Sequence, residues 1–121
     1  MKSQLDRATR LLEALERLSD SSREQRRWLR QLGDVSVDEI ALDFDAVFGP
    51  ATMDFHIYPS DLRAQLQAID DLLNSMSVQG NRSLWTVSSL ILAPEWKRIR
   101  REASRAVDSL GPLLQSWSKA N

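Results

Sequence analysis

The segment DEIALDFDAVFG, residues 38–49, holds four carboxylates within eight positions: Asp38, Glu39, Asp43 and Asp45. Carboxylates at this density could bind a metal ion or act as an acid–base pair. On a strand, Asp43 and Asp45 would share one side, as in phosphatase-type Asp-x-Asp sites, but the segment lacks the β-rich flanks and the Gly/Thr loop that such sites need. A calcium loop needs oxygens at alternate positions and a glutamate at the twelfth, and neither requirement is met.

The same segment has the pattern of an amphipathic helix. Ser36 and Glu39 have the spacing of a capping box, and Gly49-Pro50 predicts the end of the helix. One apolar face would be formed at positions i, i+4, i+7 and i+8 by Ile40, Phe44, Val47 and Phe48. Because each helical residue turns about 100°, Asp43 and Asp45 would lie about 200° apart and could not act as a close pair.

A helical structure would account for the positions of two of the four carboxylates but not of the other two. Asp38 and Glu39 would lie in a first turn, where the helix dipole favours negative charge. Asp43 and Asp45 lie further along and are better candidates for contact with another molecule. Asp54 and Asp61, which follow in the next segment, extend the candidate surface.

The elements that position these residues are predicted to be helices joined by short breaks. Apolar residues recur at spacings of three and four in residues 3–19, 22–32, 61–77 and 94–110. Residues 84–92 could form a short strand, but no second strong strand exists to pair with it, so a helix ending before Pro94 is preferred. Residues 49–61 are predicted to be irregular, and Gly111-Pro112 is expected to break or kink the last helix. The predicted fold is an all-α, single-domain bundle of five to six amphipathic helices over residues 1–121.

Length and composition exclude several classes. The chain has 121 residues, 42% of them hydrophobic and 27% charged, which suits one globular domain. It has no cysteine, so disulfides, thiolate nucleophiles and cysteine-ligated zinc are impossible. The first residues have no apolar core of a secretory signal, and no apolar run approaches the roughly 20 residues of a membrane span. A cytoplasmic protein without membrane contact is expected.

The net charge of −1 conceals an uneven distribution. Residues 1–33 hold eight basic and five acidic side chains, residues 34–79 hold one and nine, and residues 80–121 hold seven and three. The strongly acidic middle third could steer a basic partner towards the chain. Basic and acidic segments could instead neutralise one another within the fold.

Motifs of enzymes and of nucleic-acid-binding proteins are absent. The sequence has no HExxH, GxSxG or glycine-rich phosphate loop, and His56 is its only histidine. We therefore predict no catalytic residues, no metal ligands and no cofactor. The last helix would have a basic outer face formed by Lys97, Arg98, Arg100, Arg101 and Arg105, but the pI of about 5.8 and the acidic middle third disfavour nucleic acid as the partner.

The order of ALDFDAVF, LRAQLQAIDDLLNSM, LW and PEWKRIRREASRAV, over residues 38–107, resembles small helical bacterial immunity proteins that guard against polymorphic or contact-dependent toxins. The resemblance implies stoichiometric binding to a cognate toxin domain, often a basic nuclease. An acidic patch would speed such association and oppose lysine and arginine side chains.

The sequence therefore predicts a non-catalytic protein-binding module, an immunity protein that neutralises a cognate toxin domain with a basic surface. The predicted partner-binding residues are Asp38, Glu39, Asp43, Asp45, Asp54 and Asp61. Two alternatives stay open. The chain could be a nucleic-acid-binding or regulatory protein that uses its basic last helix, or a homodimeric adaptor anchored by a tryptophan such as Trp85, Trp96 or Trp117.

Overall fold

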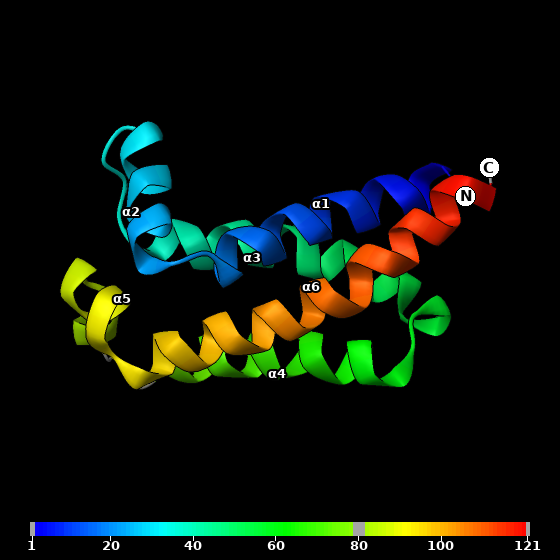
Figure 1. The fold of residues 1–121 in the computed structure, drawn as a ribbon. Coiled ribbons are helices and arrows are strands. Elements are labelled where there is room, and N and C mark those ends of the chain that lie inside the picture. The colour runs from blue at the N-terminus through cyan, green and yellow to red at the C-terminus, as the bar shows by residue number, and fades with distance from the viewer. Residues whose placement is uncertain (1, 79–81, 121) are drawn as a thin grey trace.

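The computed structural model describes residues 2–78 and 82–120, and all regular secondary structure within them is helical (Figure 1). It contains six α-helices and two short 3₁₀ helices, and the described residues form no strand. In chain order the elements are α1 (Lys2–Ser19), α2 (Ser22–Gln31), α3 (Asp38–Ala51), η1 (Thr52–Ile57), α4 (Ser60–Val78), η2 (Arg82–Trp85), α5 (Val87–Leu92) and α6 (Pro94–Ala120). The predicted fold class, an all-α single domain of five to six helices, is confirmed.

Four of the helices form a bundle around one core. Helix α1 packs most closely against α6 and then against α3, while α4 packs against α6. Helices α3 and α4 are much less closely packed against each other. Figure 1 shows α2 and α5 together at one end of the bundle, and the start of α1 and the end of α6 together at the other.

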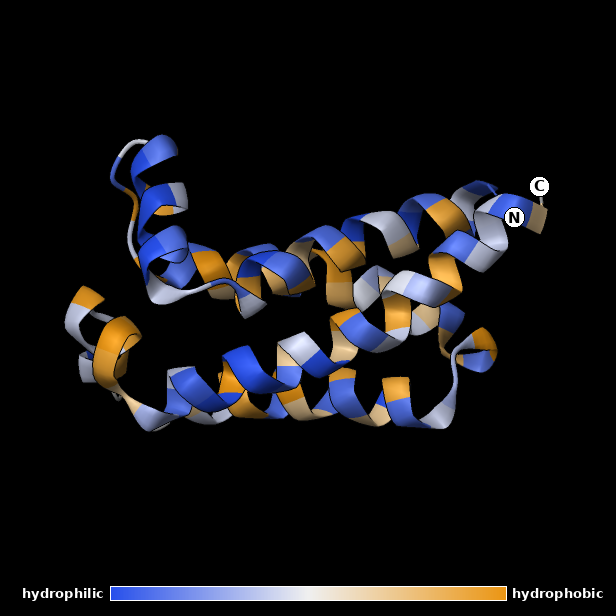
Figure 2. Ribbon diagram, in the orientation of Figure 1, coloured by the Kyte–Doolittle hydropathy of each residue, from blue (hydrophilic) through white to orange (hydrophobic). Residues whose placement is uncertain are grey.

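The apolar stripes of the sequence form this core. In Figure 2 the hydrophobic bands alternate with polar bands along each helix, as amphipathic helices require. Side chains from all four bundle helices are fully buried, among them Leu11, Leu15, Phe44, Leu66, Ile69, Trp96 and Ile99. None of the helices in the described part of the chain has a stretch apolar and long enough to cross a bilayer.

Polar side chains join α2 and α5 to the bundle. The Gln25 side chain is buried, and its amide donates hydrogen bonds to the carbonyls of Arg17 and Leu18 at the end of α1. Its oxygen accepts from the Arg100 guanidinium, which also donates to the Leu90 carbonyl of α5. Burial lowers the pKa of Arg100. This network satisfies carbonyls that the end of α1 would otherwise leave without partners.

Helix α3 differs from the prediction at both ends. The helix begins at Asp38 with Val37 as its N-cap residue, and no side chain caps it. Ser36 therefore does not form the expected capping box. The helix also does not end at Gly49-Pro50. It continues to Ala51 and passes directly into η1, where the Thr52 hydroxyl donates to the Gly49 carbonyl. Much of the segment predicted to be irregular is therefore helical.

The C-terminal half differs from the prediction in two respects. Residues 84–92 are helical, as preferred over a strand, but they divide between η2 and α5 with Thr86 capping α5. Helix α6 continues through Gly111-Pro112, so of the break or kink expected there the break does not occur. Proline removes one backbone hydrogen bond and crowds the preceding turn, but the buried side chains of Leu110 and Leu114 anchor the helix on both sides of it.

Candidate functional site

Helix α3 presents its carboxylates on two different sides. Asp38, Leu42 and Asp45 follow one another at i, i+4 and i+7 and therefore share one side. Glu39 and Asp43, four residues apart, share another. The expectation that Asp43 and Asp45 cannot act as a pair agrees with their different neighbours in the fold.

Asp43 faces α1 and forms an ion pair inside the chain. Its carboxylate accepts two hydrogen bonds from the Arg17 guanidinium, at 2.8 and 3.4 Å. The same guanidinium lies over the Trp28 ring, 4.8 Å from its centre, in a cation–π contact. Asp43 therefore helps to join α1, α2 and α3, and its charge is already balanced by Arg17.

Asp54 does not lie on the surface. Its carboxylate is only 1% exposed and accepts two hydrogen bonds from Arg7, both at 2.7 Å. Two parallel bonds of this kind are the strongest geometry available to an arginine and a carboxylate. Asp54 therefore fixes η1 to the start of α1, and its assignment to a partner surface is corrected.

Tyr58 lies beside this pair and is also buried. Its ring stacks on Trp117 with centroids 6.0 Å apart, and its hydroxyl has no hydrogen-bond partner among the described protein atoms. Burial raises the pKa of Tyr58 to about 12, and the negative charge of Asp54 adds to the effect.

The two remaining predicted residues lie apart from the stripe of Asp38 and Asp45. Glu39 is half-buried on the other side of α3. Asp61 is exposed in the first turn of α4, and its carboxylate accepts a hydrogen bond from the Leu62 backbone at 3.0 Å. The predicted surface is thus divided: Asp38 and Asp45 share a side, and the other four carboxylates do not join them there.

A different acidic surface forms where α3 and α4 are loosely packed. We call it the α3–α4 seam and define it by Asp38, Leu42 and Asp45 of α3 and Asp70 of α4. A hollow of about 140 Å³ lies between the two helices, with Asp45 and Asp70 among its lining residues. Desolvation raises the pKa of Asp70, and the neighbouring charges of Asp45 and Asp71 raise it further. No lysine or arginine within residues 2–78 and 82–120 forms an ion pair with a carboxylate of the seam.

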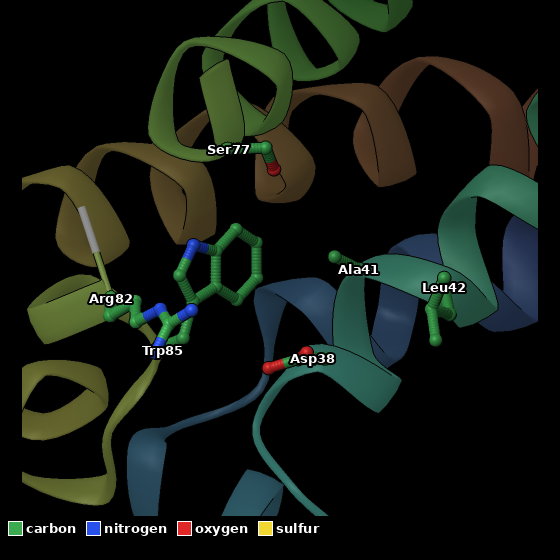
Figure 3. A pocket seen from close by; sticks show the side chains of 6 residues that line it. All are labelled: Asp38, Ala41, Leu42, Ser77, Arg82 and Trp85. Carbon is green, nitrogen blue, oxygen red and sulfur yellow. The ribbon is translucent and has the colours of Figure 1, made fainter. Parts of the chain in front are cut away.

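A larger hollow of about 470 Å³ adjoins the seam and shares Ala41, Leu42 and Ser77 with the first. We call it the Trp85 hollow; Asp38, Arg82 and Trp85 complete its lining. Figure 3 shows the Trp85 indole extending between Ser77 and Asp38 towards Ala41. Leu42 is 54% exposed beside it, which makes it one of the most exposed large apolar side chains of the described residues.

The Trp85 side chain is held firmly in this position. Its ring nitrogen donates to the Met76 carbonyl at 3.3 Å, and its ring meets the buried Trp96 edge to face, with centroids 5.6 Å apart. Trp96 in turn donates to the Leu84 carbonyl at 2.7 Å. The wall of the hollow is therefore formed before any ligand arrives.

Sequence reasoning missed the two residues that complete the seam. Leu42 lies off the apolar face of α3, four residues from both Asp38 and Ala46, so its position on a polar side was the available signal. Asp70 is one of the nine acidic side chains of residues 34–79, but nothing in the sequence showed that it would lie near Asp45, because that proximity depends on the packing of α3 beside α4.

The predicted basic face of α6 is smaller than expected. Arg100 points inwards to Gln25, and Arg105 pairs with Glu102 at 3.1 Å. Three residues of the predicted set are exposed and form neither of these contacts: Lys97, Arg98 and Arg101.

No group of three histidine, aspartate or glutamate side chains in the described ranges is arranged to hold a metal ion. Comparisons with protein-family models, with curated proteins and with solved structures find no match to this chain.

Proposed function

We propose that this chain is a non-catalytic protein-binding module that acts as an immunity-type inhibitor of a cognate toxin domain with a basic surface. The observation that supports it best is the α3–α4 seam, where the exposed Leu42 lies between Asp38 and Asp45 and opposite Asp70. An exposed apolar side chain bordered by carboxylates that form no ion pair among the described residues is consistent with a protein interface, which combines an apolar centre with a polar rim.

The charge of the seam specifies the chemistry of the partner. Asp70 is partly desolvated, and the neighbouring charge of Asp45 raises the cost of its ionisation further. A lysine or arginine placed between them would relieve that repulsion, so the binding free energy would include a gain that a neutral partner cannot provide. Rim charges of this kind mainly increase the association rate, and salt weakens their effect.

The binding surface in this proposal differs from the one expected from the sequence. It keeps Asp38 and Asp45 and gains Leu42 and Asp70. Asp43 and Asp54 serve the fold through Arg17 and Arg7. Glu39 and Asp61 lie outside the seam and would contribute only through their long-range charge.

The alternatives predict different behaviour. In a homodimer formed through the seam, two acidic surfaces would face each other, and their repulsion disfavours it. Nucleic acid would have to bind through the exposed Lys97, Arg98 and Arg101 of α6, because the seam would repel a polyanion.

The test is co-purification with the product of the neighbouring gene, followed by calorimetry of the pair at two salt concentrations. We expect a one-to-one complex whose affinity falls as the salt concentration rises. The absence of a complex, together with binding to a labelled DNA or RNA oligonucleotide or with self-association, would contradict the proposal.

A further inference from the structure

The Trp85 hollow is lined by both apolar and polar side chains. Ala41, Leu42 and the Trp85 indole form the apolar walls, whereas Asp38, Ser77 and Arg82 provide the polar groups (Figure 3). Its volume of about 470 Å³ lies within the range of sites that bury a small organic group. A single side chain of another protein would therefore fit within it.

The ring of Trp85 is available to such a side chain, although its N–H is not. The N–H is engaged by the Met76 carbonyl, and the ring is braced by Trp96. A guest would therefore meet the apolar ring and would not need to displace a hydrogen bond. Because the wall is already ordered, binding would require little loss of conformational entropy in the host.

The charges nearby distinguish among guests. Asp38 lies at the hollow itself, and Asp45 and Asp70 follow along the connected seam. A cation attached next to an apolar side chain would meet these carboxylates when the apolar group enters. The Arg82 guanidinium, which also lines the hollow, offsets part of this negative charge, but an anion in the same place would still face three carboxylates against one guanidinium.

We infer that the Trp85 hollow receives an aliphatic or aromatic side chain of the partner, and that a lysine or arginine next to this side chain binds against Asp38 and the seam. This inference rests on the proposed function and specifies how the partner is held. Leu42 packs against the apolar guest, and the carboxylates select the basic neighbour.

The inference is tested on the full chain without the natural partner. Three capped dipeptides serve as probes: acetyl-Leu-Lys-amide, acetyl-Leu-Glu-amide and acetyl-Gly-Lys-amide. Each is titrated into ¹⁵N-labelled protein while the NMR shift of the Trp85 indole N–H is followed. We expect acetyl-Leu-Lys-amide to shift this signal, with half-saturation at a concentration about threefold or more below that of either other probe. The glutamate probe loses a surface charge pair, which has an effect of this order, and the glycine probe loses the buried apolar side chain.

Two exposed leucines provide matched variants. Leu42→Ala removes a wall of the hollow and should weaken the response to acetyl-Leu-Lys-amide. Leu92→Ala removes a leucine that is 67% exposed on α5 and should leave the response unchanged. Because both side chains are exposed, both variants are expected to fold.

The inference is overturned if acetyl-Gly-Lys-amide matches acetyl-Leu-Lys-amide, or if shifts spread over the surface without involving Trp85. In either case the partner complex can still form and remain salt-sensitive, which would leave the proposed function standing. Conversely, a response of the Trp85 signal to acetyl-Leu-Lys-amide without any complex with the neighbouring gene product would support side-chain binding in the hollow and contradict the immunity role.

Discussion

Replacing Asp54 by asparagine should destabilise the fold, although replacing Asp45 in the same way should not. Asp54 is 1% exposed and accepts two 2.7 Å bonds from Arg7. Asparagine has one acceptor where the carboxylate has two, so it would present an N–H₂ group to one of the guanidinium donors. Losing a charge-assisted bond at a buried position costs about 2–3 kcal/mol. The lower part of this range is favoured, because the Arg7 side chain remains partly in contact with water.

The assay is urea denaturation followed by tryptophan fluorescence. With a slope of about 1–3 kcal/mol per molar urea, a loss of about 2 kcal/mol lowers the midpoint by roughly 1 M. Asp45→Asn is the matched control: the same substitution at an exposed seam carboxylate should move the midpoint by only a few tenths of a molar. Equal midpoints for Asp54→Asn and the wild type would refute the structural role assigned to Asp54.

Two further substitutions test buried polar groups. Tyr58→Phe removes a buried hydroxyl without a described protein partner, so stability at pH 7 should stay the same or rise by up to about 1 kcal/mol. Because the folded pKa of Tyr58 is about 12 against an ordinary 10.0, the folded chain retains a proton that the unfolded chain releases between these values. Wild-type stability should therefore fall as the pH rises through that window, and Tyr58→Phe should reduce the fall; identical pH profiles from denaturation curves would contradict this. Arg100→Met leaves the Gln25 oxygen and the Leu90 carbonyl without their donor and should lower the free energy of unfolding by about 1–3 kcal/mol. Amide hydrogen exchange in α5 should become faster. Unchanged exchange there would contradict the role of Arg100 in connecting α2, α5 and α6.

Local patterns were sufficient for the helices because each stripe is encoded within its own segment. The spacing of Leu11, Leu15 and Leu18 predicts both α1 and its buried side, and all three side chains are buried. The same reasoning ended α3 too early, at Gly49-Pro50, and allowed a break at Gly111-Pro112 where α6 is continuous. There the packing of Ala51, Leu110 and Leu114 outweighs the local cost of proline.

The candidate site was less accessible to sequence reasoning. Asp43, Asp45 and Asp54 look alike in the sequence, but they differ in what the fold brings to them. Arg17 is 26 residues from Asp43, and Arg7 is 47 residues from Asp54. Such long-range pairs leave no local signal, whereas the stripe of Asp38, Leu42 and Asp45 does, because it lies within one helix.

The most direct test of the account is the affinity of the complex with the neighbouring gene product after charge reversal in the seam. Asp45→Lys and Asp70→Lys should each weaken the complex, and together they should remove most of its salt dependence. Asp108→Lys changes an exposed carboxylate on α6 outside the seam and controls for the change in net charge. Weaker binding by the seam variants, with binding by Asp108→Lys near that of the wild type, is the predicted result. Affinity and salt dependence that are the same in the seam variants, in Asp108→Lys and in the wild type would contradict the proposed binding surface.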